Sequence, residues 1–135
     1  MITPLFIAEC FCVLVLDRNS SSIHTIQPSE HVSLSGFDGM YTWRDCLVGI
    51  QNSLGSPRVA VVRLDANQAQ TVGLTLLEYR TQFTHLPTTG AIVGDTFYYI
   101  TNSQFDHYQD GKLLRTDELV PNTVAKVSLV QPSDK

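Results

Sequence analysis

The chain has 135 residues, of which 43% are hydrophobic and 16% are charged, and its nine basic and thirteen acidic side chains give a formal net charge of −4. This length is enough for one domain with a buried core. The charged fraction is low against roughly 25% in an average globular domain, which favours a sheet protein over a solvated helical one. No Lys/Arg run provides the basic surface that nucleic-acid binding needs, so no nucleic-acid partner is expected.

The first apolar stretch, residues 4–16, is broken at Glu9 and is too short for a membrane span. It lacks the basic segment and cleavage site of a signal peptide, so we expect two strands and no membrane partner. The three cysteines, Cys10, Cys12 and Cys46, contain no CxxC pair. They favour reduced, packed thiols, with a Cys10–Cys12 metal pair as the alternative. The expected location is cytoplasmic, or secreted or periplasmic if a signal peptide precedes a truncated start.

Strand-like runs follow one another as three repeats, spaced roughly 40 to 50 residues apart, a period typical of propeller blades. In each repeat an apolar or aromatic run ends on a polar side chain, and a second apolar run follows. The first runs are Leu5–Glu9, Leu47–Asn52 and Phe97–Asn102; the second runs are Val13–Asp17, Val59–Asp65 and Val124–Leu129. The closest internal match lies between VLVLD in the first repeat and VVRLD in the second.

This repeat predicts an all-β fold, a single partial β-propeller of about two and a half four-stranded antiparallel blades, with blade remnants at 1–30, 31–83 and 84–135. The expected strands lie near 3–9, 13–17, 23–26, 39–44, 46–52, 58–65, 72–78, 89–94, 96–102 and 123–130. Turn residues such as Arg44-Asp45 and Gly94-Asp95 stand where a hairpin should reverse. Only residues 75–83 compete as a helix.

The chain is organised around Gly36-Phe37-Asp38-Gly39, which leads into a hairpin that ends on Gln51-Asn52. The residue before the first strand of a hairpin and the residue after its second strand lie at the same end. Asp38 and Asn52 are therefore expected at one edge of the sheet. The alternative for Asp38 is that it caps a turn before Gly39, and Asn52 is equally suited to binding turn backbone.

Glu9 and Asn102 end the equivalent runs of the other two repeats, so they are expected on the same rim, and each is equally suited to binding turn backbone. His85 precedes the expected strand at residues 89–94 and is a candidate acid or base near that rim, with a solvated loop histidine as the alternative. No GxSxG or HExxH motif is present, so the catalytic residues are not identified.

The long connection from Ser103 to Asn122 differs from the tight turns elsewhere. Its segment from Asp106 to Asp117 is similar to a calcium-binding EF-hand loop, but Tyr108 and Leu114 stand at ligand positions. We therefore expect a solvated excursion rather than a calcium loop.

The repeats resemble the C-terminal blades of the gluconolactonase, senescence-marker and luciferin-regenerating family, which is related to paraoxonase and to NHL-type propellers. The likeness runs from about Leu5 to Val130, and its most specific parts are GFDGM at 36–40 and GDTFYYITNSQ at 94–104. It implies a six-bladed propeller that holds a divalent cation, commonly calcium, at the mouth of its central channel. There the ion polarises a lactone or ester carbonyl.

Under this resemblance Asp38 is the metal ligand, and Glu9, Asn52, Asn102 and His85 line the rim or channel. Thr88 and Thr89 stand where the next blade would carry a residue equivalent to Asp38, and threonine is a poorer cation ligand. The family's early Glu ligand and its mid-chain Asn ligands have no counterpart here, so the matched ligand set is incomplete.

Three hypotheses follow from these observations. The first is that the chain is the C-terminal portion of a calcium-dependent lactone or ester hydrolase. The second is a non-catalytic propeller scaffold or binding module. The third is a truncated fragment without activity of its own, or one part of an assembly, because unclosed blades expose strand edges that invite self-association.

Overall fold

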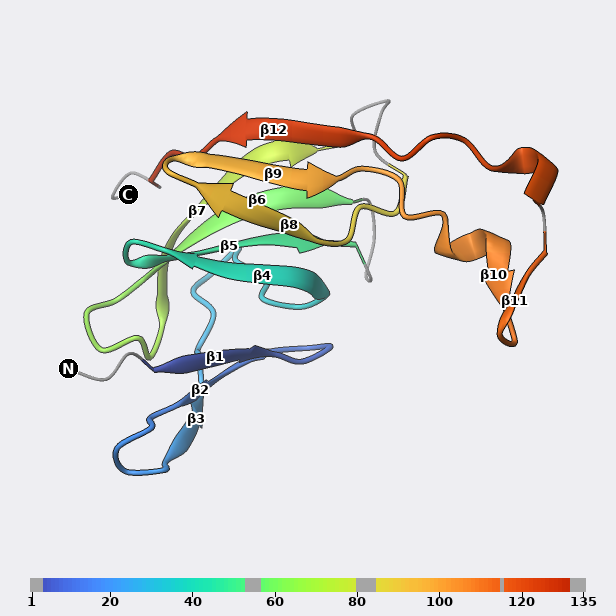
Figure 1. Cartoon of the computed structure of the whole chain (residues 1–135). Helices are drawn as coiled ribbons and strands as arrows, with labels where there is room; N and C mark the ends of the chain where they lie inside the picture. Colours follow the sequence, from blue (N-terminus) through green and yellow to red (C-terminus); the bar gives the residue numbers. More distant parts are fainter. Residues whose placement is uncertain (1–3, 53–56, 80–84, 115, 132–135) are drawn as a thin grey trace.

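The computed structural model describes residues 4–52, 57–79, 85–114 and 116–131, and within these residues the fold is all-β (Figure 1). Three antiparallel sheets follow one another along the chain. The first sheet consists of β1 (Leu5–Ala8), β2 (Val13–Leu16) and β3 (Ile23–Thr25). The second consists of β4 (Phe37–Trp43), β5 (Cys46–Gln51), β6 (Arg58–Leu64) and β7 (Thr71–Tyr79), and the third of β8 (Gly90–Val93), β9 (Thr96–Ile100) and β12 (Val124–Ser128).

Between β9 and β12 the chain leaves the third sheet and forms an exposed arm. The arm contains the short strands β10 (Tyr108–Gln109) and β11 (Lys112–Leu113), with the 3-10 turns η1 (Phe105–His107) and η2 (Thr116–Glu118) on either side. Figure 1 shows the arm extending away from the stacked sheets. The arm is the solvated excursion that was expected between Ser103 and Asn122, but its hairpin was not predicted.

The expected strands are all present in the described residues, with boundaries shifted by a few positions. The all-β class is therefore confirmed, and each sheet that the structure describes is open, not closed into a barrel. The helix alternative is wrong for residues 75–79, because β7 continues to Tyr79 and pairs with β6 along its length. Residues 80–83 of that prediction lie outside the described part of the chain.

The sheets stack face to face in chain order, and the second sheet lies between the other two (Figure 1). We call the face of a sheet that points along the stack in the direction from the first sheet to the third its forward face, and the opposite face its backward face. Side chains alternate between the two faces along each strand. In the second sheet Val48 and Val61 on the forward face pack against the third sheet, and Leu47 and Val62 on the backward face pack against the first.

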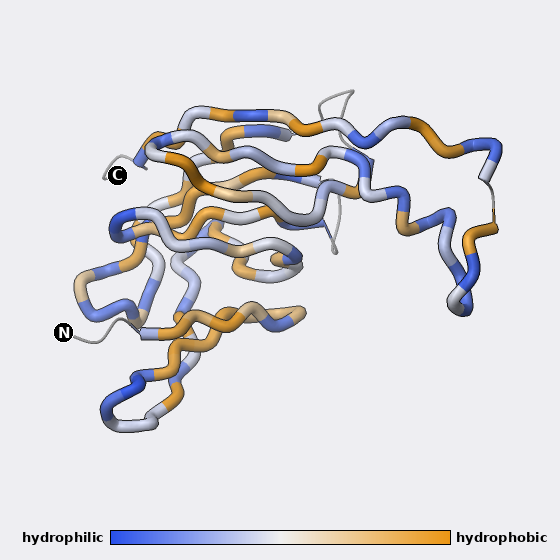
Figure 2. The backbone as a smooth tube through the Cα atoms, in the orientation of Figure 1, coloured by the Kyte–Doolittle hydropathy of each residue, from blue (hydrophilic) through white to orange (hydrophobic). Residues whose placement is uncertain are grey.

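Hydrophobic residues are concentrated in the strands and hydrophilic residues in the turns (Figure 2). β5 is buried along its whole length, as expected of a strand covered on both faces. Gly49 in this strand leaves room for the ring of Phe37, because a Cβ atom at Gly49 would clash with that ring. Packing of the second sheet thus depends on a small residue at this position.

The turns at one end of the second and third sheets are fastened to each other by polar contacts. The indole Nε1 of Trp43 donates a hydrogen bond to Asp95 Oδ1 over 2.9 Å. The Arg44 guanidinium donates to both Asp95 oxygens, at 3.1 and 3.0 Å, and lies 4.6 Å from the centre of the Trp43 ring. Arg44 has a φ of 56° in its two-residue turn, so the backbone conformation also directs this contact.

Equivalent turns follow β2 and β6. The backbone N–H of Asp17 donates to the carbonyl five residues later, and so does that of Asp65, each over 2.9 Å. Both carboxylates also accept hydrogen bonds from turn amides. These bonds, foremost those from the Asn19 amide to Asp17 and from the Gln70 amide to Asp65, hold the pKa of each carboxyl below its ordinary value of 3.8.

This pKa depression makes the turns a source of acid sensitivity. The unfolded chain binds protons more readily at these carboxyls, so their stabilisation is present above pH 3.8 and is lost as the pH falls through the lower, folded pKa values. We expect the free energy of unfolding of the native chain to exceed that of an Asp17→Asn/Asp65→Asn double variant at pH 7, with the difference shrinking toward pH 2. Urea unfolding at several pH values measures it, and a difference that stays constant would contradict this origin.

Packing between the second and third sheets depends on Ile50, which is fully buried. An Ile50→Ala substitution should lower the free energy of unfolding by about 2–5 kcal/mol, because it removes buried methyl groups and leaves a cavity. Leu114→Ala is the control, since Leu114 is 54% exposed in the arm and its loss should cost about 0.5 kcal/mol or less. Equal effects of the two substitutions in urea unfolding would show that Ile50 is not part of a packed core.

Candidate functional site

Asp38 lies at a β-bulge at the start of β4. The register pairs Phe37 with Gln51 and Gly39 with Ile50, so Asp38 is the extra, unpaired residue between them. Its side chain is exposed at the end of the second sheet. Gly36, with a φ of 76°, lets the chain turn sharply into this strand. The Gly-Phe-Asp-Gly segment thus presents a carboxylate at the rim.

Asn52 lies directly beside Asp38. Its Nδ2 donates a hydrogen bond to Asp38 Oδ2 over 2.9 Å and a second one to the carbonyl oxygen of Pro87 over 2.5 Å. Its backbone N–H donates to Gly36 over 3.1 Å. The amide therefore joins the rim of the second sheet to the segment that leads into the third. A carboxylate, an amide and a carbonyl converge at this point.

Thr88 and Thr89 lie against the same strand, on the seam between the second and third sheets. A Cβ atom at Gly39 would clash with the carbonyl oxygen of Thr88, so glycine permits this close approach. The hydroxyl of Tyr41 lies 2.9 Å from Thr89 Oγ1 and accepts a hydrogen bond of 2.7 Å from the Gly90 backbone N–H. Both threonines thus contact β4 and help to join the second sheet to the third.

Asn102 is buried at the end of the third sheet, where it binds the returning end of the arm. Its Nδ2 donates to the carbonyl oxygen of Pro121 over 3.1 Å, and its Oδ1 accepts from the backbone N–H of Thr123 over 2.7 Å. Both polar groups of the side chain are thus bound to backbone, which corresponds to the alternative that the sequence had left open for it.

His85, which precedes the third sheet in the chain, contacts both the end of that sheet and the arm. Its backbone N–H donates to Thr101 over 2.8 Å, and its Nε2 lies 3.2 Å from Asp106 Oδ2. Hydrogen bonding by His85 holds the pKa of Asp106 below its ordinary value of 3.8. His107 Nε2 lies 3.8 Å from the same carboxylate oxygen. Asp106, the first residue of the EF-hand-like segment, is therefore paired with histidine.

Glu9 stabilises the turn between β1 and β2. Its carboxylate accepts a hydrogen bond of 3.0 Å from the backbone N–H of Phe11, and its own N–H donates to the carbonyl oxygen of Cys12 over 2.9 Å. Cys10 and Cys12 belong to this turn and not to a strand. Cys46 lies in the core, and burial raises the pKa of its thiol to about 12.

The arm has the turn chemistry of a tight hairpin. Asp110 and Gly111 have φ values of 50° and 76°, as a type I′ turn between two short strands requires. The Asp-Gly pair flanked by Tyr108 and Leu113 was the signal that could have predicted this hairpin.

Within the part of the chain that the structure describes, no three His, Cys, Asp or Glu side chains are grouped so as to hold a metal ion.

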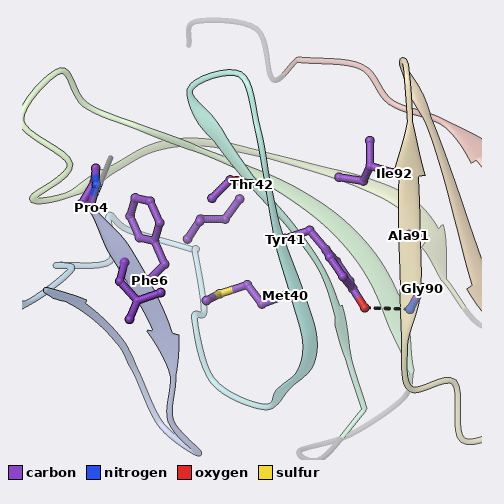
Figure 3. A pocket seen from close by; sticks show the side chains of 10 residues that line it. Pro4, Phe6, Met40, Tyr41, Thr42, Gly90, Ala91 and Ile92 are labelled. Carbon is purple, nitrogen blue, oxygen red and sulfur yellow. Dashed lines mark hydrogen bonds between the residues drawn. The ribbon is translucent and has the colours of Figure 1, made fainter. Parts of the chain in front are cut away.

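A separate cavity of about 550 Å³ lies along the edge strands β1, β4 and β8 (Figure 3). Figure 3 shows Met40 extending from β4 toward β1, where Phe6 lies, and the hydrogen bond from the Gly90 backbone N–H to the Tyr41 hydroxyl. The lining is mostly apolar and is made by Pro4, Leu5, Phe6, Met40, Tyr41, Thr42, Leu47, Gly90, Ala91 and Ile92. The five predicted site residues are not among these, so the cavity and the Asp38–Asn52 pair are distinct features.

The described part of the chain contains no helix long and apolar enough to span a membrane. Comparisons of the chain with protein-family models, with curated proteins and with solved structures found no match. The resemblance carried by GFDGM and GDTFYYITNSQ therefore stays a prediction based on those motifs.

Proposed function

We propose that the chain forms three neighbouring blades of a β-propeller and acts as a scaffold or binding module, without hydrolytic activity of its own. The order of the strands in each sheet, which follows the chain, supports the propeller architecture. So does the stacking of each sheet on the next through one apolar face. The edge strands β1, β4 and β8 line a common cavity, as strands gathered around one axis would.

The non-catalytic part of the proposal is supported by the hydrogen bonds that the rim side chains form with other groups of the same chain. Asn102 binds two backbone groups, Glu9 binds turn backbone, and His85 binds Asp106. Asn52 binds both Asp38 and Pro87. Side chains that join separate segments of the chain by hydrogen bonds stabilise the rim as a surface to which a partner or ligand can bind.

This role of Asn52 is tested by Asn52→Asp, which keeps the shape but removes the donor and places a second carboxylate beside Asp38. We expect Asn52→Asp to lower the melting temperature at pH 7. Asn52→Ala should lower the free energy of unfolding by about 0.5–1.5 kcal/mol for each hydrogen bond that it removes. Gln109→Glu adds the same charge on the exposed β10 and is the matched control. An Asn52→Asp variant as stable as the native chain would remove the main support for this proposal.

One observation favours a cation-dependent lactone or ester hydrolase as a second candidate. Asp38 Oδ2 and the Pro87 carbonyl oxygen bind the same nitrogen of Asn52, so two oxygens already converge on one point. Rotation of the Asn52 amide by half a turn would add its Oδ1. Calcium takes roughly six to eight oxygen ligands, so water, substrate or other blades would supply the remainder. Such an ion would act as a Lewis acid on a lactone or ester carbonyl.

The two candidates differ in their response to calcium. The hydrolase hypothesis predicts that calcium raises the melting temperature and that Asp38→Ala weakens this effect far more than Asn52→Ala, because Asp38 carries the only charge of the three converging groups. Thermal melting over a calcium titration, with a lactone hydrolysis assay, measures both. Equal effects of the two variants would reject Asp38 as the ligand. No calcium shift and no hydrolysis would reject this candidate and leave the scaffold.

A further inference from the structure

Within the part of the chain that the structure describes, the forward face of the third sheet is largely apolar and exposed. The register places Tyr98 beside Ala91 on one side and Lys126 on the other, so these residues share that face. Tyr98 is 38% exposed, and Val93 and Val124, on the same face, are 65% and 64% exposed. Lys126 is its one charged strand residue, and a lysine stem can lie along apolar surface while the ammonium group reaches water. A sheet face in contact with water is normally polar, so an apolar face of this kind is suited to packing against another apolar surface.

The backward face of the first sheet, at the other end of the stack, has the same character. The register of β1, β2 and β3 places five aliphatic side chains on it, Leu5, Ile7, Leu14, Leu16 and Ile23. Three of them, Leu5, Ile7 and Ile23, are 50%, 38% and 60% exposed. An aliphatic surface of this kind across three strands is typical of an interaction surface.

The internal repeat shows what covers a forward face. Counting back from Asn102 and Asn52, which end the equivalent runs of the third and second repeats, Tyr98 corresponds to Val48 and Ile100 to Ile50. Val48 and Ile50 are fully buried, and they pack against the backward face of the next sheet. Tyr98 and Ile100 therefore occupy positions that, one sheet earlier, are covered by a backward face.

The same comparison shows what covers a backward face. VLVLD at 13–17 corresponds to VVRLD at 61–65, and the matching hydrogen bonds of the Asp17 and Asp65 turns support this alignment. Leu14 and Leu16 then correspond to Val62 and Leu64, which are 0% and 5% exposed because the forward face of the first sheet covers them.

We propose that the forward face of the third sheet of one copy docks on the backward face of the first sheet of a second copy. The inference rests on the proposed propeller stacking, but on no ligand and no activity. Both buried contacts between sheets within the described chain join a forward face to a backward face. The two exposed faces lie at opposite ends of one stack with the second sheet between them (Figure 1), so they cannot meet within the described chain, whereas two copies can bring them together. The contact is therefore head to tail.

The test is the mass of the protein in solution, measured by size exclusion with light scattering. The native chain should elute as a multiple of its 15.0 kDa mass. Tyr98→Lys on the forward face and Ile7→Glu on the backward face should each weaken association about tenfold or more, because a charge is then placed in an apolar contact. Circular dichroism and melting curves check that both variants remain folded.

Mixing the two variants distinguishes a head-to-tail contact from a symmetric one. In a mixed pair, the intact forward face of the Ile7→Glu copy meets the intact backward face of the Tyr98→Lys copy, so association should return. Leu114→Lys, on the exposed arm, is the control and should leave the mass unchanged. A monomeric native chain, a mixture that stays monomeric, or loss of association in Leu114→Lys would each overturn the proposal. A monomer that is still destabilised by Asn52→Asp would leave the scaffold role intact.

Discussion

The structure depends on the burial of the second sheet on both of its faces. Leu47 and Val62 face the first sheet, and Val48 and Val61 face the third, so consecutive residues of one strand contribute to two different cores. If β5 slipped by one residue, the side chains of one core would move into the other. Because both sets are aliphatic, polarity does not oppose such a slip, and the shapes of the side chains must hold the register. The clearest instance is Gly49, which leaves room for the ring of Phe37.

This packing determines where the polar rim lies. Once β5 is set between two cores, the residue that follows it, Asn52, emerges beside the bulge of β4 and reaches Asp38. The third sheet then approaches so closely that Gly39 lies against the Thr88 carbonyl. At the opposite end of the sheets, Arg44 and Trp43 hold Asp95. The two sheets are thus joined by polar contacts at both ends and by apolar contacts between them.

The arm shows how a segment with little core follows local rules. Asp110-Gly111 forms its tight turn, and polar side chains at its base, including Asn102 and His85, bind it to the third sheet. Its exposed aromatic and aliphatic residues, Phe105 and Leu114 among them, bury little surface. The arm therefore depends more on hydrogen bonds at its base than on packing.

The sequence by itself determined which residues form the strands of the three stacked sheets, because alternation of apolar side chains and turn residues such as Arg44-Asp45 act over a few neighbouring positions. It also placed Asp38 and Asn52 together, since a hairpin joins them locally. Only the tertiary structure decided that Asn52 also binds Pro87, 35 residues away, and that Asn102 binds the arm. Such partners come from segments that packing brings together, and no local pattern encodes that packing.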